Sequence, residues 1–315
     1  MENTIKELKR KNMVDISEDI QAYTGYDVFV FDSRSRNFVL YKPKGRPIET
    51  IRVLNEKLPE SLYVSLSDKT HFITSTQKRY NKKLKYTLKT NPYKSKQLMS
   101  QVLDIGSINP DPIVFDQMKE TIDLVLEEYL ADSNIVKRLI DVTTKDFSTS
   151  IHSVNVMLYC LRYARACGFS YRNLKFFGLM GLLHDVGKIR LSKNVLTAPR
   201  KLTDEEFQEV KNHSKYGWEI LRQSQLNSKI RAAALQHHER SDGSGYPNGL
   251  SSKKILPEAK ALAIADVYEA LTNWRPYKAP VPPLKALEII KKDVLMKKMD
   301  EEAFIKFAKS LVNGK

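Results

Sequence analysis

The sequence predicts an α+β protein, with a small α/β or β-rich region in residues 1–110 and an all-helical bundle in residues 132–315. Short alternating apolar segments with turn residues between them lie in the first region. Beyond the two prolines of residues 107–112, apolar residues recur at helical spacing instead. Five of the six histidines also lie in the second region.

The composition describes an ordinary globular chain. Its 315 residues are 42% hydrophobic and 28% charged, which is enough for a proper core and for two domains. No stretch approaches the roughly 18 apolar residues that a membrane span needs, and the first residues lack the apolar segment of a secretory signal. The two cysteines, Cys160 and Cys167, are expected to be core thiols. These features predict a cytoplasmic protein that is not integral to a membrane.

The formal net charge of +15 favours anionic partners such as nucleotides, nucleic acid or an anionic membrane surface. The excess is spread over both halves of the chain, and within it residues 69–103 contain nine Lys or Arg, no Asp or Glu, and interleaved Tyr80, Tyr86 and Tyr93. This pattern is consistent with a contact for phosphates or a membrane surface. The reading we favour is a solvated helix face that carries the positive charge of this region.

The first elements are strands. Residues 26–31 and 38–41 are rich in β-formers around a turn at 32–37, which predicts a hairpin, and residues 62–66 predict a further strand. This N-terminal region lacks a catalytic constellation, so we expect it to be regulatory or partner-binding.

Helices are expected after that region. Residues 111–131 predict a linker helix, and 239–256 are polar and glycine-rich, hence a loop. The remaining apolar periodicity predicts helices at 133–147, 150–167, 171–186, 203–223, 227–238, 257–273, 282–295 and 300–312.

The histidines of the helical region suggest a metal site. Imidazole and carboxylate are ligands of first-row transition metals. A set without cysteine suits iron or manganese, and also zinc, but not a structural zinc site. The alternative is a series of separate, hydrogen-bonded helix histidines. The candidate ligands are His152, His184, Asp185, His213, His237, His238 and Asp266.

Two carboxylates in this set have local features that favour a metal. Residues 179–188 change abruptly from apolar to polar, which predicts a buried helix that delivers His184 and Asp185, with Gly187 as its C-cap. The two oxygens of Asp185 can bridge metals about 3.5–4 Å apart. Asp266 lies in an apolar stretch, where an unpaired carboxylate would be costly.

Five motifs in this order resemble the HD-GYP family of cyclic di-GMP phosphodiesterases: HDVGK at 184–188, HHE at 237–239, DGSGYP at 242–247, DVYEALT at 266–272 and RPYK at 275–278. The resemblance covers residues 130–315 and implies an HD-type helical bundle. It implies that all seven candidates are metal ligands, with Asp185 bridging, and that Lys188 faces the scissile phosphate. It also implies that the substrate is held by Arg275, Lys278 and the loop residues Gly245 and Tyr246.

The resemblance implies hydrolysis of cyclic di-GMP, or a related cyclic dinucleotide, to linear pGpG, with further cleavage to GMP left open. A hydroxide shared by two divalent transition-metal ions would attack phosphorus, with iron expected first and manganese or zinc as alternatives. Asp185 and Lys188 are the catalytic candidates. The alternatives are a catalytically weak cyclic dinucleotide receptor or signalling scaffold, and a different HD phosphohydrolase.

The chain departs from the family at two positions. Some members hold a third metal through a glutamate where Ser148 stands, so the resemblance implies two metals here. Glu269 stands where the family usually has aspartate. A signalling protein partner, through the GYP loop or the N-terminal domain, and a homodimer are further expectations.

Overall fold

The computed structural model describes residues 6–9, 25–46, 61–65, 67–107, 112–142, 148–196, 198, 200–275 and 279–312. By packing, the chain divides into two compact units, Met1–Thr76 and Gln77–Lys315. From the sequence, we expected the boundary between the two domains near residue 110, where the composition changes. The assignment of separate roles to these regions stays a prediction.

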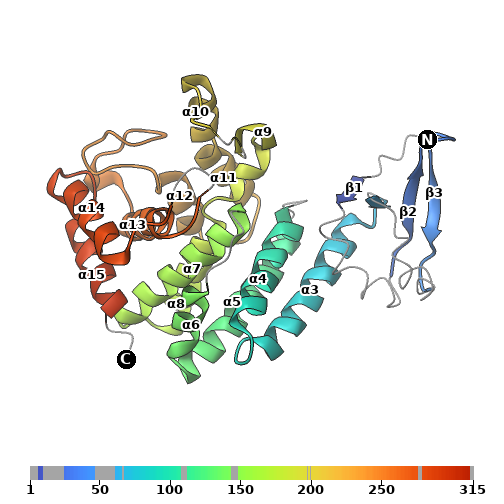
Figure 1. The fold of residues 1–315 in the computed structure, drawn as a ribbon, viewed down its shortest axis with the longest axis horizontal. Helices are drawn as coiled ribbons and strands as arrows, with labels where there is room; N and C mark the ends of the chain where they lie inside the picture. Colours follow the sequence, from blue (N-terminus) through green and yellow to red (C-terminus); the bar gives the residue numbers. More distant parts are fainter. Residues whose placement is uncertain are drawn as a thin grey trace. The chain divides into compact units, whose positions relative to one another are not determined.

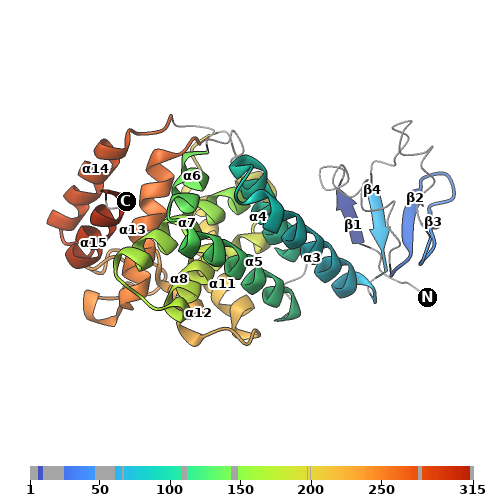
Figure 2. The same cartoon turned by 90° about the horizontal axis from the view of Figure 1, so that it is seen from below.

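The first unit contains an antiparallel sheet in the order β1-β4-β2-β3. Its strands are β1 (Lys6–Lys9), β2 (Val28–Asp32), β3 (Asn37–Lys42) and β4 (Ser61–Val64) (Figure 2). The expected hairpin is confirmed, because Phe31 pairs with Phe38 across the turn. The carboxylate of Asp32 accepts hydrogen bonds from the backbone of Arg34 and Ser35 and so stabilises the turn. Strand β1 was not predicted, since its sequence KELK lacks β-forming residues.

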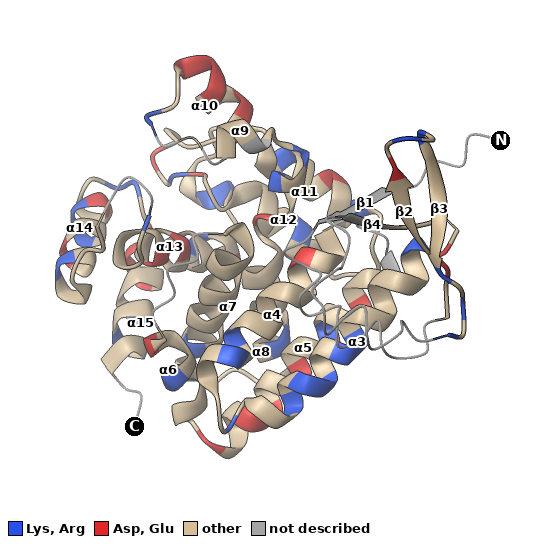
Figure 3. Cartoon of the chain, turned by 45° about the vertical axis from the view of Figure 1, so that its right-hand side comes forward, with Lys and Arg blue, Asp and Glu red and all other residues tan. Residues whose placement is uncertain are grey.

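Two long helices lie in the region that the sequence assigned to an α/β or β-rich fold. These are α3 (Lys69–Thr87) and α4 (Pro92–Ser107), followed by the expected linker helix α5 (Pro112–Ala131) (Figure 1). Lys78, Lys82 and Lys85 are exposed on α3, which is the solvated helix face expected as one reading (Figure 3). Lys96 differs, because it is buried on α4 and donates to the carbonyl of Val142 at 2.9 Å.

The helical bundle is built around α7 (Thr149–Ala166), which packs against α4, α8 and α13. Helix α7 is buried almost all round because apolar residues occupy every side of it. The other helices are α6 (Asn134–Asp141), α8 (Tyr171–Leu183), α9 (Lys193–Leu196), α10 (Asp204–Lys211), α11 (His213–Arg222), α12 (Ser228–Gln236), α13 (Pro257–Thr272), α14 (Pro283–Leu295) and α15 (Glu301–Val312).

Two expected helices differ from the prediction. The helix expected at 203–223 is two helices, α10 and α11, which meet at Asn212. The helix expected at 171–186 ends at Leu183, and a 3-10 helix, η2 (Val186–Arg190), follows. Of the helix expected at 133–147, residues 143–147 lie outside the described residues.

Gly187 is therefore not a helix C-cap, and its glycine identity has another cause. It lies within η2, where a Cβ atom would come within 1.9 Å of the His213 carbonyl oxygen and 2.4 Å of the Gly217 nitrogen. A residue without a side chain is needed because η2 and α11 are in main-chain contact here.

Two smaller expectations are also tested. Both cysteines are free, and Cys160 is a buried core thiol as expected, whereas Cys167 is only half-buried. The predicted loop at 239–256 is irregular apart from a short 3-10 helix, η3 (Ser252–Lys254). Among the described helices, none combines the length and apolar character that crossing a bilayer requires.

Candidate metal centre

The seven candidate ligands converge from five places in the bundle. His152 lies in the first turn of α7, and His184 and Asp185 follow the last turn of α8. The remaining four lie at the start of α11, directly after α12 and within α13: His213, His237, His238 and Asp266. Their nitrogen and oxygen atoms form overlapping groups whose members lie within 4.8 Å of one another. The reading of separate, unrelated histidines is therefore wrong.

Asp185 lies between two groups of ligands. Its Oδ2 is 3.4 Å from Nε2 of His152 and 3.4 Å from Nε2 of His184. Its Oδ1 is 3.3 Å from Nε2 of His213 and 3.8 Å from Nε2 of His237. Each oxygen of one carboxylate thus faces a different pair of imidazoles, an arrangement suited to two neighbouring cations.

Backbone carbonyls orient three of the imidazoles. Nδ1 of each lies near the carbonyl oxygen three residues earlier, at 2.8 Å for His184, 2.6 Å for His213 and 2.8 Å for His237. Since a carbonyl oxygen only accepts, Nδ1 must carry the proton and Nε2 offers a lone pair to the centre.

The surroundings of the Nε2 atom of His184 show whether these residues fit a metal ion. It is buried and has no hydrogen-bond partner in the described structure. A buried polar atom without a partner costs free energy, and a cation would remove that cost. Together with the nitrogen and oxygen donors around it, this atom indicates that the residues suit a divalent transition metal.

Burial and charge set the protonation states that metal binding needs. Burial lowers the pKa of His184, His213 and His237, and it lowers the pKa of His238 to about 3. These imidazoles are therefore neutral and able to coordinate. Burial raises the pKa of Asp185, but Lys188 and the neighbouring histidines outweigh it, so that the carboxyl stays ionised.

Glu269, whose role the sequence did not explain, contacts a candidate ligand and a residue of the cavity wall. Its Oε2 lies 2.5 Å from Nδ1 of His152 and 2.7 Å from Nη2 of Arg275. Its Oε1 accepts a hydrogen bond from Asn155 at 2.8 Å. Burial lowers the pKa of His152, but the charges of Glu269 and Asp266 outweigh it and raise this pKa to about 9. Without metal, His152 is therefore held as an imidazolium between two carboxylates.

Ser148 caps the helix that carries His152. Its hydroxyl accepts a hydrogen bond from the backbone nitrogen of Ile151 at 3.3 Å. Ser148 therefore has a structural role as the N-cap of α7.

The loop after His238 packs against the centre. The carboxylate of Glu239 accepts hydrogen bonds from the backbone of Asn248 and Leu250, at 2.7 and 2.8 Å. A Cβ atom at Gly245 would come within 2.3 Å of the Arg240 nitrogen, so only glycine fits. Both sequence-predicted loop contacts, Gly245 and Tyr246, lie against this part of the chain, and their contact with a substrate stays a prediction.

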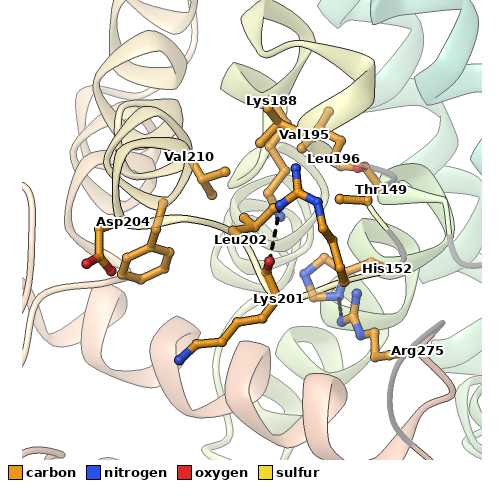
Figure 4. Close-up of a pocket in the computed structure, with 13 residues that line it drawn as sticks. Thr149, His152, Lys188, Val195, Leu196, Lys201, Leu202, Asp204, Val210 and Arg275 are labelled. Atoms are coloured by element: carbon orange, nitrogen blue, oxygen red, sulfur yellow. Dashed lines mark hydrogen bonds between the residues drawn. The ribbon is translucent and has the colours of Figure 1, made fainter.

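A cavity of about 710 Å³ opens beside the ligands (Figure 4). His152, Lys188 and Arg275 line it, and Lys188 also donates to Oδ2 of Asp185 at 2.5 Å. The segment from α9 to α10 supplies an apolar part of the wall: Val195, Leu196, Ala198, Leu202, Phe207 and Val210. Lys278, the other expected phosphate contact, lies outside the described residues.

Comparison with known families gives a match over the same region. A family model described as HD domain matches residues 134–303. These residues include every candidate ligand and most of the bundle.

Several curated proteins are similar to this part of the chain. The "Cyclic di-GMP phosphodiesterase PA4108" of Pseudomonas aeruginosa is 37% identical over 160 residues, covering 50% of this chain and 39% of that protein. The "Cyclic di-GMP phosphodiesterase response regulator RpfG" of Xanthomonas campestris pv. campestris is 44% identical over 118 residues, covering 36% and 31%. The "3'3'-cGAMP-specific phosphodiesterase 1" of Vibrio cholerae is 32% identical over 181 residues, covering 58% and 42%. The chain thus spans less than half the length of these relatives.

A solved structure is similar over nearly the whole chain. It is that of Bd1817, a HDG"Y"P protein from Bdellovibrio bacteriovorus, with a TM-score of 0.62 and 15% sequence identity. The match covers 98% of this chain and 100% of that one, so the two proteins share a fold.

Proposed function

The chain belongs to the HD domain family, and we propose that it is a metal-dependent phosphodiesterase that hydrolyses cyclic di-GMP to linear pGpG. The observation that carries the proposal is the position of Asp185, whose two oxygens face separate histidine groups. One of these histidines, His152, lines a cavity together with Lys188. The names of the similar curated proteins, all cyclic dinucleotide phosphodiesterases, support the substrate class.

In this proposal two divalent cations occupy the centre. His152, His184 and Asp266 would hold one, and His213, His237 and His238 the other, with Asp185 shared. The donor set suits iron first, with manganese or zinc as alternatives. When bound, such cations supply a water made nucleophilic near neutral pH.

The protein's own side chains would bind and orient the substrate. Lys188 and Arg275 line the cavity next to the ligands, where their charges can stabilise phosphate oxygens as negative charge develops. A guanidinium carries five N–H donors, so the bond from Arg275 to Glu269 leaves others for a phosphate. Lys278 would add a second cation, as the motif implies.

The cavity suits a ligand of this size and character. Its volume of about 710 Å³ lies in the range of roughly 300–1,000 Å³ typical of small-molecule sites. Cationic groups line it together with the apolar residues of α9 and α10, which matches a molecule with phosphates and flat bases. Direct contacts from Gly245 and Tyr246, a protein partner at their loop or at the N-terminal region, a homodimer and a cytoplasmic location remain predictions.

The test is product analysis with defined metal. Protein purified anaerobically with iron or manganese is incubated with cyclic di-GMP or 3'3'-cGAMP, and products are separated by chromatography. We expect pGpG from cyclic di-GMP, and the time course shows whether GMP follows. Asp185→Asn should abolish turnover. Tight binding without turnover would indicate a receptor instead, and turnover by Asp185→Asn at the parent rate would contradict the proposal.

A further inference from the structure

Both ring nitrogens of His152 are bound by carboxylates from the same helix. Asp266 lies 3.1 Å from Nε2, and Glu269 lies 2.5 Å from Nδ1. The two acids are three residues apart on α13 and therefore project from neighbouring positions of one helix face. The orientation of the His152 ring is thus determined by α13.

His152 also differs from the other oriented ligands in its Nδ1 partner. His184, His213 and His237 use backbone carbonyls, whereas His152 uses a buried, charged side chain. A carboxylate behind an imidazole fixes its tautomer and raises its basicity as a ligand.

The same carboxylate oxygen holds a residue of the cavity wall. Nη2 of Arg275 donates to Oε2 of Glu269 at 2.7 Å and lies 3.1 Å from Nδ1 of His152. Figure 4 shows Arg275 and His152 side by side at the edge of the cavity. Asn155 holds the other oxygen of Glu269 from α7, so the carboxylate cannot turn without losing a bond.

We infer that Glu269 is a positioning residue that couples metal binding at His152 to phosphate binding at Arg275. This inference rests on the proposed function, which identifies the substrate. The effect of Glu269 on metal affinity can be measured whether or not the protein hydrolyses that substrate. Glutamine at this position keeps the size of the side chain and removes the negative charge that faces both the His152 imidazole and the Arg275 guanidinium.

The first measurement is titration of the metal-free protein with Mn²⁺ by calorimetry. We expect Glu269→Gln to weaken the affinity by about 10–100-fold, the range typical of residues that support metal-binding histidines. Arg275→Ala, which leaves the Glu269 carboxylate on His152, should weaken Mn²⁺ binding much less than Glu269→Gln does. Glu128→Gln, the same change on a half-buried carboxylate of α5 that pairs with Lys89, is the matched control and should also bind like the parent.

The second measurement is the KM for cyclic di-GMP. Glu269→Gln and Arg275→Ala should each raise KM, and the double variant should raise it no further than Arg275→Ala alone, because Glu269 acts on the phosphate through Arg275. Asn155→Leu removes the hydrogen bond from Asn155 to Glu269 and keeps the Glu269 carboxylate, so it should lose less Mn²⁺ affinity than Glu269→Gln. This variant replaces Glu269→Gln in the test if Glu269→Gln does not fold.

Parent-like Mn²⁺ affinity in both Glu269→Gln and Asn155→Leu would overturn the inference, as would additive effects on KM. If cyclic di-GMP is not hydrolysed at all, the proposed function fails, yet the Mn²⁺ titration still decides whether Glu269 supports His152.

Discussion

The phenol ring of Tyr246 stacks on the imidazole of His238, with centroids 4.6 Å apart and an angle of 29° between the planes. The tyrosine of the GYP loop therefore contacts a candidate metal ligand directly. This stacking restricts the orientation of the His238 ring.

This contact predicts a graded response at Tyr246. Aromatic pairs contribute about 0.5–1.5 kcal/mol beyond area burial, which corresponds to roughly 2–13-fold in affinity. Tyr246→Leu should weaken Mn²⁺ binding by that amount, whereas Tyr246→Phe, which keeps the ring, should not. Calorimetric titration distinguishes the two. Equal losses in both variants would show that the hydroxyl, and not the stacking, matters.

Metal removal should destabilise the protein. A ligand that binds only the folded state at 100 times its Kd adds about 2.7 kcal/mol to the free energy of unfolding. For a chain of this size, we expect chelation to lower the Tm by about 5–10 °C and Mn²⁺ to restore it. Asp185→Asn should show little of this response, and a Tm in the parent that ignores both treatments would argue against a metal centre.

The apolar wall of the cavity predicts a contact for a base. Phe207 is 46% exposed and lines the cavity. Stacking of a base on an aromatic ring contributes about 1–3 kcal/mol, so Phe207→Ala should raise KM by roughly tenfold and leave kcat unchanged. Phe169→Ala is the matched control, since Phe169 is also partly exposed but does not line the cavity. A similar KM in both variants would exclude stacking at Phe207.

Buried Lys96 predicts a pH-dependent stability. Burial lowers its pKa from 10.5 to about 8, against the opposing charges of Glu269 and Asp141. Between these two values the unfolded chain binds more protons, so this group stabilises the fold increasingly as pH rises from about 8 to 10.5. Below pH 8 the folded protein carries the full cost of a buried ammonium.

Lys96→Met removes this cost and leaves the Val142 carbonyl without its donor. We compare the free energy of unfolding of the variant minus that of the parent at each pH. This difference should be more positive at pH 7 than at pH 10, by roughly 1–3 kcal/mol. Urea unfolding at both values measures the difference. Lys89→Met, at an exposed lysine, should show no such pH dependence, and the same pH-independent result at Lys96 would contradict the prediction.

Substitution by alanine should have opposite effects at Gly187 and at Gly217. A Cβ atom at Gly187 would meet the His213 carbonyl at 1.9 Å, whereas at Gly217 it would meet only ordinary contacts of 3.5 Å or more. Gly187→Ala should cost about 2–3 kcal/mol of stability and reduce metal content, because His213 must move. Gly217→Ala should be tolerated. Thermal unfolding and elemental analysis compare the two, and an unperturbed Gly187→Ala would refute the contact.

The convergence of the candidate ligands was predictable from the sequence because their chemistry is rare and their spacing is local. His184 beside Asp185, and His237 beside His238, stand at the ends of apolar runs that had to be buried helices. Asp266 was recognisable because a carboxylate in an apolar stretch needs a partner.

Contacts across long sequence distances were not predictable. Glu269 meets His152 from 117 residues away, and no periodicity connects the two. Glycine is needed at residue 187 because of main-chain atoms in α11, which the local sequence does not reveal. The residues around Gly187 therefore suggested the end of a helix. Helix α3 was expected only as a solvated helix face within residues 69–103, because its many lysines and tyrosines did not show where it begins and ends.

The main-chain contact between Gly187 and α11 has a consequence for which ions the protein accepts. It sets the separation of the His184–Asp185 pair from His213 through backbone atoms, which yield far less than side chains do. A centre held at a fixed width discriminates by ionic radius. Calcium, with its longer bonds and its preference for many oxygen atoms, should be rejected even when it is far more abundant than iron or manganese.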